Sequence, residues 1–114
     1  MEFPVPPIER VDLNQVFAAL ADPMRRLVIA ELAGAPLDGE RACASFPMPV
    51  AKSTKTHHWR VLREAGLILQ RDAGNGTFVR LRRPEFDQRF PGLLDTLSRL
   101  TRGEDGAPGD DSAS

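Results

Sequence analysis

Cysteine and long apolar segments are scarce in this sequence of 114 residues, and both scarcities narrow the class of protein. The single cysteine, Cys43, cannot form an internal disulfide and excludes a zinc site built from four cysteines. No apolar run approaches the ~20 residues that a helix needs to cross a bilayer, and the N-terminus lacks a basic start followed by an apolar core. We therefore expect one small cytoplasmic domain, with no membrane contact and a core that a partner subunit helps to stabilise.

The patterns that mark most enzymes are also missing. No paired carboxylates, phosphate-binding loop or nucleophile beside a base stands out. His57 and His58 are adjacent and would diverge by about 100° on a helix, so they cannot chelate one ion. Glu85, Asp87 and Asp95 lack the imidazole neighbours of a transition-metal site. We expect no catalytic residue, no metal and no cofactor.

What the chain does contain is an amphipathic segment over residues 52–65, in which one helical face is apolar. The opposite face carries short hydroxyls, an imidazole and cations, with one acid near its end: Ser53, Thr56, His57, Arg60 and Glu64. Hydroxyl and imidazole groups reach base edges and phosphate oxygens, and cations neutralise phosphate charge. From this segment alone, DNA contact and an ordinary solvated face are both open.

The residues that follow favour DNA contact. Gly66 suits a left-handed helix cap, residues 67–71 and 77–82 have strand character, and Gly74-Asn75-Gly76 between them tolerates positive φ. A helix followed directly by a basic hairpin predicts a winged helix. Although the net charge is -1, residues 52–83 hold eight cations against two acids.

Two stretches then resemble the signatures of the ArsR family of bacterial winged helix-turn-helix repressors. Residues 53–68, Ser-Thr-Lys-Thr-His-His-Trp-Arg-Val-Leu-Arg-Glu-Ala-Gly-Leu-Ile, are similar to the family's recognition helix. Residues 19–32, which include Ala-Asp-Pro-Met-Arg-Arg, are similar to the start of its second helix. The match covers about residues 10 to 101. It implies a mainly α fold with a small β-hairpin, of about five helices and a two-stranded wing.

The resemblance also implies a function. We expect a sequence-specific transcriptional regulator, a homodimeric repressor that binds a palindromic operator in double-stranded DNA through the helix at 52–65 and the wing at 71–83. The expected DNA-binding residues are Lys52, Ser53, Lys55, Thr56, His57, Arg60, Arg71, Asn75, Arg80 and Arg82. In the family a small polar residue usually caps this helix where Ala51 stands, so Ser53 is an alternative cap.

The first and last helices form the dimer interface in the family, and both segments are apolar on one side here. The expected dimer residues are Leu13, Val16, Phe17, Phe90, Leu93, Leu94, Leu97 and Leu100. Many family members sense metals through cysteine pairs or histidine and acid ligands, and those residues are missing from this chain. An unidentified small-molecule effector therefore stays open.

Four local expectations complete the chain. Asp12 with Gln15 resembles a capping box, and Asp22-Pro23 begins a second helix with Arg25 and Arg26 as a solvated pair, or paired with a phosphate or with Asp22. Residues 38–46 should be a short helix, with His58 and Trp59 facing inward on the next one. Pro91-Gly92 should precede a final helix. Cys43 is either a small buried residue or a reactive thiol.

The ends of the chain should lie outside the domain at 10–102. Residues 1–9 have three prolines and predict an extended arm, and the acidic tail at 103–114 has no large apolar residue and should be disordered. Two functional alternatives stay open. One is a winged-helix module for protein–protein interaction, and the other is a thiol- or ligand-responsive sensor of the same fold.

Overall fold

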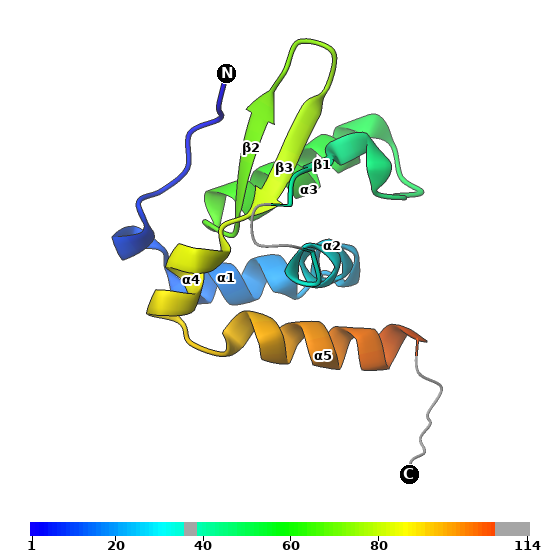
Figure 1. Cartoon of the computed structure of the whole chain (residues 1–114). Helices are drawn as coiled ribbons and strands as arrows, with labels where there is room; N and C mark the ends of the chain where they lie inside the picture. The colour runs from blue at the N-terminus through cyan, green and yellow to red at the C-terminus, as the bar shows by residue number, and fades with distance from the viewer. Residues whose placement is uncertain (36–38, 107–114) are drawn as a thin grey trace.

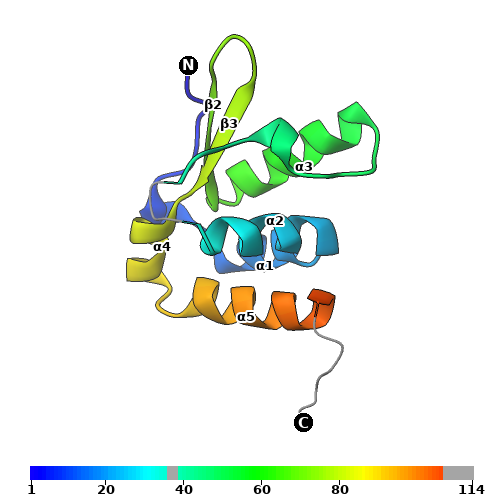
Figure 2. The same ribbon diagram turned by 45° about the vertical axis from the view of Figure 1, so that its right-hand side comes forward.

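The computed structural model describes residues 1–35 and 39–106, which form five α-helices and a three-stranded antiparallel sheet (Figure 1). Figure 2 shows the layers: α5 lies on one side, α1 and α2 are in the middle, and α3 and the hairpin are on the other side. The predicted winged-helix fold is confirmed, but the sheet has three strands where two were expected. Within the described residues, no helix is long and apolar enough to cross a membrane.

Aspartates begin the first two helices, as expected. Helix α1 spans Leu13–Leu20, and the Asp12 side chain accepts a hydrogen bond from the Asn14 N–H at 3.0 Å. Helix α2 spans Pro23–Ala33, and Asp22 accepts from the next two N–H groups at 2.8 and 3.2 Å. The predicted capping box does not form, because Gln15 donates to the Glu64 carbonyl at 3.2 Å. This side chain therefore joins α1 to the end of α3.

The stretch expected as a short helix at 38–46 is different. Strand β1, Arg41–Ala42, pairs antiparallel with β3, and a single 3-10 turn, Cys43–Ser45, follows. Side chains compete for the backbone here, because Ser45 Oγ donates to the Ala42 carbonyl at 2.7 Å and Arg41 donates to the Ser45 carbonyl. The predicted helix is wrong for these residues, and Asp38 lies outside the described part of the chain.

The wing consists of β2, Ile68–Asp72, and β3, Thr77–Leu81, in the sheet order β1-β3-β2. Two glycines adopt the positive φ angles that the start of the wing and its turn require. Gly66 has φ of 84° after α3, and a Cβ there would lie 2.5 Å from Val11 Cγ2. Gly74 has φ of 89° in the hairpin turn. A side chain at Gly66 would therefore meet both a strained backbone and a clash.

The N-terminal arm lies along the free edge of the wing in an extended conformation (Figure 1). The Phe3 N–H donates to the Gln70 carbonyl at 2.9 Å, and the Asp72 N–H donates to the Met1 carbonyl at 2.7 Å. A short 3-10 helix, Ile8–Arg10, then leads to Val11 in the core. The arm thus covers an edge strand that would otherwise present unpaired backbone groups.

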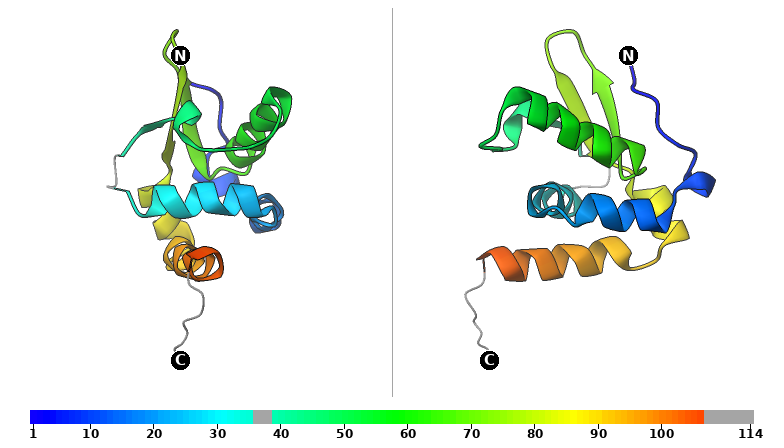
Figure 3. Two further views of the ribbon diagram at one scale, coloured as in Figure 1. Left: turned by 90° about the vertical axis from the view of Figure 1, so that its right-hand side faces the viewer. Right: turned by 180° about the vertical axis from the view of Figure 1, so that it is seen from behind.

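Helix α4 spans Arg83–Arg89, and after the expected break at Pro91-Gly92 helix α5 spans Leu93–Gly106 and packs along α2. Figure 3 shows α5 and α3 on opposite sides of the α1–α2 layer. The helix includes residues 103–106, the first four of the predicted tail, and residues 107–114 lie outside the described part. The largest fully buried side chains come from every layer: Phe86, Ile29, Leu62, Leu67, Ile68 and Leu94.

Candidate nucleic-acid interface

Helix α3 spans Lys52–Glu64 and presents the polar face that the sequence predicted. Ala51 occupies the cap position and makes no side-chain cap bond, so Ser53 is not the cap. The exposed residues of the helix are Lys52, Ser53, Thr54, Lys55, Thr56, His57, Arg60 and Glu64. Thr54 is also exposed, although it lies on the same helical side as buried His58. The first six residues of α3 are therefore free of the core on every side.

The inner face of α3 begins at His58 and Trp59, which are both buried. The Trp59 ring contacts the Phe46 ring edge-on, with centroids 5.5 Å apart and planes at 65°. Both residues lie as the helical pattern predicted, and Trp59 is a packing residue. Two shallow hollows, of about 250 and 390 Å³, separate this side of α3 from the wing and share Thr56, Trp59 and Thr77.

Arg25 and Arg26 are not a solvated pair. Arg25 Nε donates to the Ala19 carbonyl at 2.7 Å, and Arg26 Nη1 donates to the Leu20 carbonyl at 2.8 Å. These carbonyls end α1, where a helix favours cations. The pair therefore compensates the C-terminus of α1, and Arg25 also reaches His58 Nδ1 at 2.9 Å.

Cations on the outer face of α3 have no carboxylate partner among the described residues. Lys52 and Lys55 lie at the exposed N-terminal end, and Arg60 contacts only the His57 imidazole, with 3.2 Å between Nη2 and Nδ1. Arg80 on β3 forms no salt bridge in the described chain either, although its charge lies near enough to Glu40 to help lower the pKa of that carboxyl. These four charges are available to an anionic partner.

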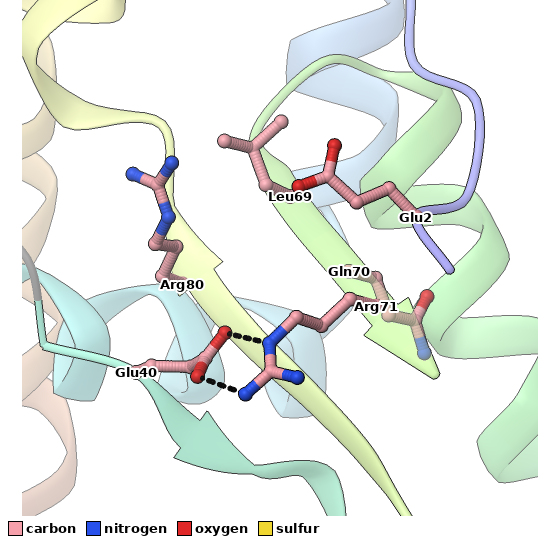
Figure 4. Close-up of a pocket in the computed structure, with 6 residues that line it drawn as sticks. All are labelled: Glu2, Glu40, Leu69, Gln70, Arg71 and Arg80. Carbon is pink, nitrogen blue, oxygen red and sulfur yellow. Dashed lines mark hydrogen bonds and ion pairs between the residues drawn. The ribbon is translucent and has the colours of Figure 1, made fainter. Parts of the chain in front are cut away.

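Arg71, by contrast, is held by an acid on the outer face of the sheet. Its Nε and Nη2 atoms each donate to Glu40 at 2.8 Å, and its guanidinium lies 5.0 Å from the Phe78 ring centre. The hydrogen bonds from Arg71 hold the pKa of Glu40 below its usual range, and Glu40 raises the pKa of Arg71. Figure 4 shows the two-bond pair, with the Arg80 guanidinium pointing away from it.

Arg82 is not a DNA-facing residue, and this part of the predicted site is wrong. Its side chain is 6% exposed, Nη1 donates to the Pro6 carbonyl at 2.6 Å and Nε pairs with Glu85 at 3.0 Å. The strand ends at Leu81, so Arg82 does not follow the alternation by which strand residues face in and out. Arg82 joins the arm to α4 instead.

A polar chain between α3 and the wing was missed by the sequence reasoning. Arg63 donates to Gln70 Oε1 at 2.7 Å, and buried Gln70 donates to Cys43 Sγ at 3.7 Å. Arg63 also lies over the Phe3 ring, 4.6 Å from its centre. The sequence signal was Gln70, which lies two residues after Ile68 and therefore on the same inward face of the strand. A buried glutamine needs hydrogen-bond partners. Cys43 is buried, and burial raises the pKa of its thiol, which favours the small buried residue over the reactive thiol.

The apolar residues expected at a dimer interface divide into two groups. Phe17 and Leu100 are 52% and 64% exposed, Leu13 is also exposed, and Phe90, Leu93 and Leu97 are partly buried against the core. Val16 and Leu94 are fully buried within this chain, so they cannot contact a partner and the prediction is wrong for them. Helical periodicity placed all eight on apolar faces but could not separate the core side from the outer side.

Among the side chains that the structure describes, no three histidine, cysteine or acidic groups come close enough to hold a metal ion. A hairpin wing beside a helix with hydroxyls and unpaired cations on its outer face defines a winged helix-turn-helix protein of the DNA-binding class.

Known proteins agree with this class. No protein-family model matches the chain. It is 35% identical over 86 residues to the uncharacterized HTH-type transcriptional regulator YceK of Bacillus subtilis (strain 168), covering 73% of this chain and 83% of that protein. The solved ArsR-like transcriptional regulator from Rhodococcus sp. RHA1 is 25% identical with a TM-score of 0.54, covering 79% of this chain and 83% of that one.

A second solved structure, described as a possible transcriptional regulator for arsenical resistance, is 30% identical with a TM-score of 0.52. It covers 73% of this chain and 88% of that one. The chain belongs to the ArsR family of HTH-type transcriptional regulators, a non-enzymatic class. The predicted family is confirmed.

Proposed function

We propose that the protein is a homodimeric repressor that binds a palindromic operator through α3 and the wing. The observation that carries this proposal is the outer face of α3, where Lys52, Lys55 and Arg60 have no carboxylate partner among the described residues. Unpaired cations neutralise DNA phosphates without first breaking an internal ion pair. Ser53, Thr56 and His57 lie between them and supply the groups that read base edges.

The wing adds phosphate contacts on one flank of the helix. Arg80 forms no salt bridge in the described chain, and Asn75 is exposed in the hairpin turn. Arg71 contributes only when a phosphate displaces Glu40 from its two hydrogen bonds. The DNA-binding set that we propose is Lys52, Ser53, Lys55, Thr56, His57, Arg60, Asn75 and Arg80, with Arg71 as a conditional member.

The proposed dimer forms through the exposed apolar residues of α1 and α5. Leu13, Phe17 and Leu100 are large and solvent-exposed in this chain, and Phe90, Leu93 and Leu97 are partly buried against the core. A two-fold dimer reads successive major grooves when its two copies of α3 lie roughly 34 Å apart. An effector would act by changing this spacing.

Binding to DNA across a salt series tests the proposal. The purified, metal-free protein is titrated onto the DNA upstream of its own gene and onto a scrambled duplex of the same composition. We expect tight and selective binding, with log K falling by about 0.9 per neutralised phosphate as log salt rises. Analytical ultracentrifugation of the same samples should give the mass of two chains.

Weak binding to both duplexes that does not change with salt would contradict the proposal. It would favour the winged-helix module that binds protein. Selective binding that is lost only on thiol oxidation would instead favour the thiol-responsive sensor, and replacement of Cys43 by serine would then abolish the response.

A further inference from the structure

One arginine side chain joins its own helix, α2, to α1 and to the recognition helix α3. Arg25, in the first turn of α2, donates from Nε to the Ala19 carbonyl of α1 at 2.7 Å and reaches His58 Nδ1 of α3 at 2.9 Å. Asp22 accepts from the Arg25 N–H at 3.2 Å and so holds the turn that carries this arginine. A single planar guanidinium therefore ties α3 to the layer beneath it.

The direction of this contact determines the state of the imidazole. A guanidinium only donates hydrogen bonds and keeps its proton in proteins. His58 Nδ1 must therefore accept, which requires a neutral ring with its hydrogen on Nε2. A protonated His58 would turn an N–H group toward a cation 2.9 Å away and lose the bond.

The contact lies where it controls the exposed end of α3. Residues 52–57 are all exposed, and His58 is the first buried residue of the helix. Six residues rise roughly 9 Å, so a tilt of about 10° at His58 would move the helix start by about 1.5 Å. That displacement is large enough to break hydrogen bonds to base edges, which need heavy-atom distances near 3 Å.

We infer that Arg25 is a positioning residue for DNA recognition, which through neutral His58 sets the orientation of the exposed N-terminal half of α3. Protonation of His58 releases that half. The inference rests on the proposed function for its effect on DNA, and its effect on the helix can be measured without DNA.

Charges around His58 set the direction of the pH dependence. Burial lowers the pKa of His58, Asp22 opposes this, and the charges of Arg25 and His57 support it. The ring is therefore neutral at pH 7, and the attachment is lost as pH falls through the lowered pKa. Asp22 and Arg25 face it from α2, and His57 from its own helix.

Three variants test the inference. Arg25→Lys keeps the charge but cannot bridge both the Ala19 carbonyl and the imidazole. His58→Asn places an amide oxygen near the position of Nδ1 and does not titrate. His57→Asn is the control for the exposed imidazole, and it is read by Trp59 emission alone because His57 belongs to the proposed DNA-binding set. Affinity for upstream and scrambled DNA is measured from pH 7.5 to 5, together with fluorescence of Trp59, the chain's single tryptophan.

At pH 7.5 we expect Arg25→Lys to lose tenfold or more of the affinity for upstream DNA, with little change on scrambled DNA and a folded circular dichroism spectrum. Selectivity of the wild type should fall at acidic pH while Trp59 emission shifts. His58→Asn should remove both changes, and His57→Asn should retain the shift in Trp59 emission. Wild-type selectivity in folded Arg25→Lys, or an unchanged pH profile in His58→Asn, would overturn the inference.

A measurement on the free protein separates this inference from the proposed function. Nitrogen chemical shifts of the His58 ring should show the Nε2–H form at pH 7.5 in the wild type. A wild type that binds no DNA contradicts the proposed function alone. The tautomer of the His58 ring and the shift of Trp59 emission at acidic pH then test whether Arg25 holds His58. A ring with its hydrogen on Nδ1 would overturn the inference.

Discussion

Two groups of cations in this molecule have opposite surroundings. On the outer face of α3, Lys52 and Lys55 are exposed and have no acid beside them in the described chain. Between β3 and α4, Arg82 and Arg83 are largely buried and donate to backbone carbonyls as well as to carboxylates. The same residue class therefore holds the fold together in one region and stays available to a partner in the other.

Because of this difference, the number of cations in a stretch of sequence does not show how many of them are available to bind DNA. The eight cations of residues 52–83 indicated a basic DNA-facing surface. Of these, Arg71, Arg82 and Arg83 pair with acids, and Arg63 binds a buried glutamine. Long arginine side chains reach partners that lie far away in the sequence, so a window of residues overcounts the charge available to phosphate.

Replacement of Arg82 by methionine should give the largest effect on stability. The change removes two hydrogen bonds of a charged group, to the Pro6 carbonyl and to Glu85, and should lower the free energy of unfolding by about 3 kcal/mol. Urea unfolding measures this, with Arg80→Met as the matched control that leaves stability nearly unchanged. An equal loss in both variants would remove the distinction between the two groups of cations.

Replacement of Thr56 by alanine should act on recognition alone. Thr56 is exposed on α3 between the unpaired cations, so the upstream site should lose about 2 kcal/mol of binding free energy and scrambled DNA almost none. Fluorescence anisotropy with the two duplexes measures the difference. The role that we propose for Thr56 fails when both duplexes lose affinity equally.

A change of Lys52 to glutamine should weaken all DNA sequences alike, by about 1 kcal/mol at low salt, because it removes one phosphate contact. The slope of log K against log salt should become shallower by about 0.9. The free energy of unfolding, measured by thermal denaturation, should stay within ±0.5 kcal/mol of the wild-type value, because Lys52 is exposed and has no carboxylate partner among the described residues. A steep loss of stability would place Lys52 with the structural group.

Glu40→Gln should free Arg71 from its internal ion pair, so that it joins the cations that are available to DNA phosphates. Loss of the carboxylate charge weakens the two-bond pair, so affinity for any DNA should rise severalfold and the salt slope should steepen by roughly 0.9. Because the pair is partly exposed, stability should fall by less than about 1 kcal/mol. An unchanged salt slope would mean that Arg71 does not reach DNA.

Local signals in the chain were sufficient for most helices and for the wing. The aspartates at 12 and 22 cap α1 and α2, Gly66 takes positive φ after α3, and the inward side of α3 begins at His58 as its 3.6-residue period requires. Each depends on a backbone or packing preference that acts within a few residues. The recognition helix and its polar face follow from these preferences together with the family signatures.

Partners far away in the sequence determined the rest. Residues 41–42 became a strand because β3 offered an open edge, although their own pattern was helical. Val16 and Phe17 are adjacent on α1, yet the core covers one and leaves the other exposed. Pro6, Glu40 and His58 turned Arg82, Arg71 and Arg25 into structural residues. Sequence supplies the charge and the face of each side chain, and the packing of distant segments determines whether that charge is neutralised within the fold or remains free to bind DNA.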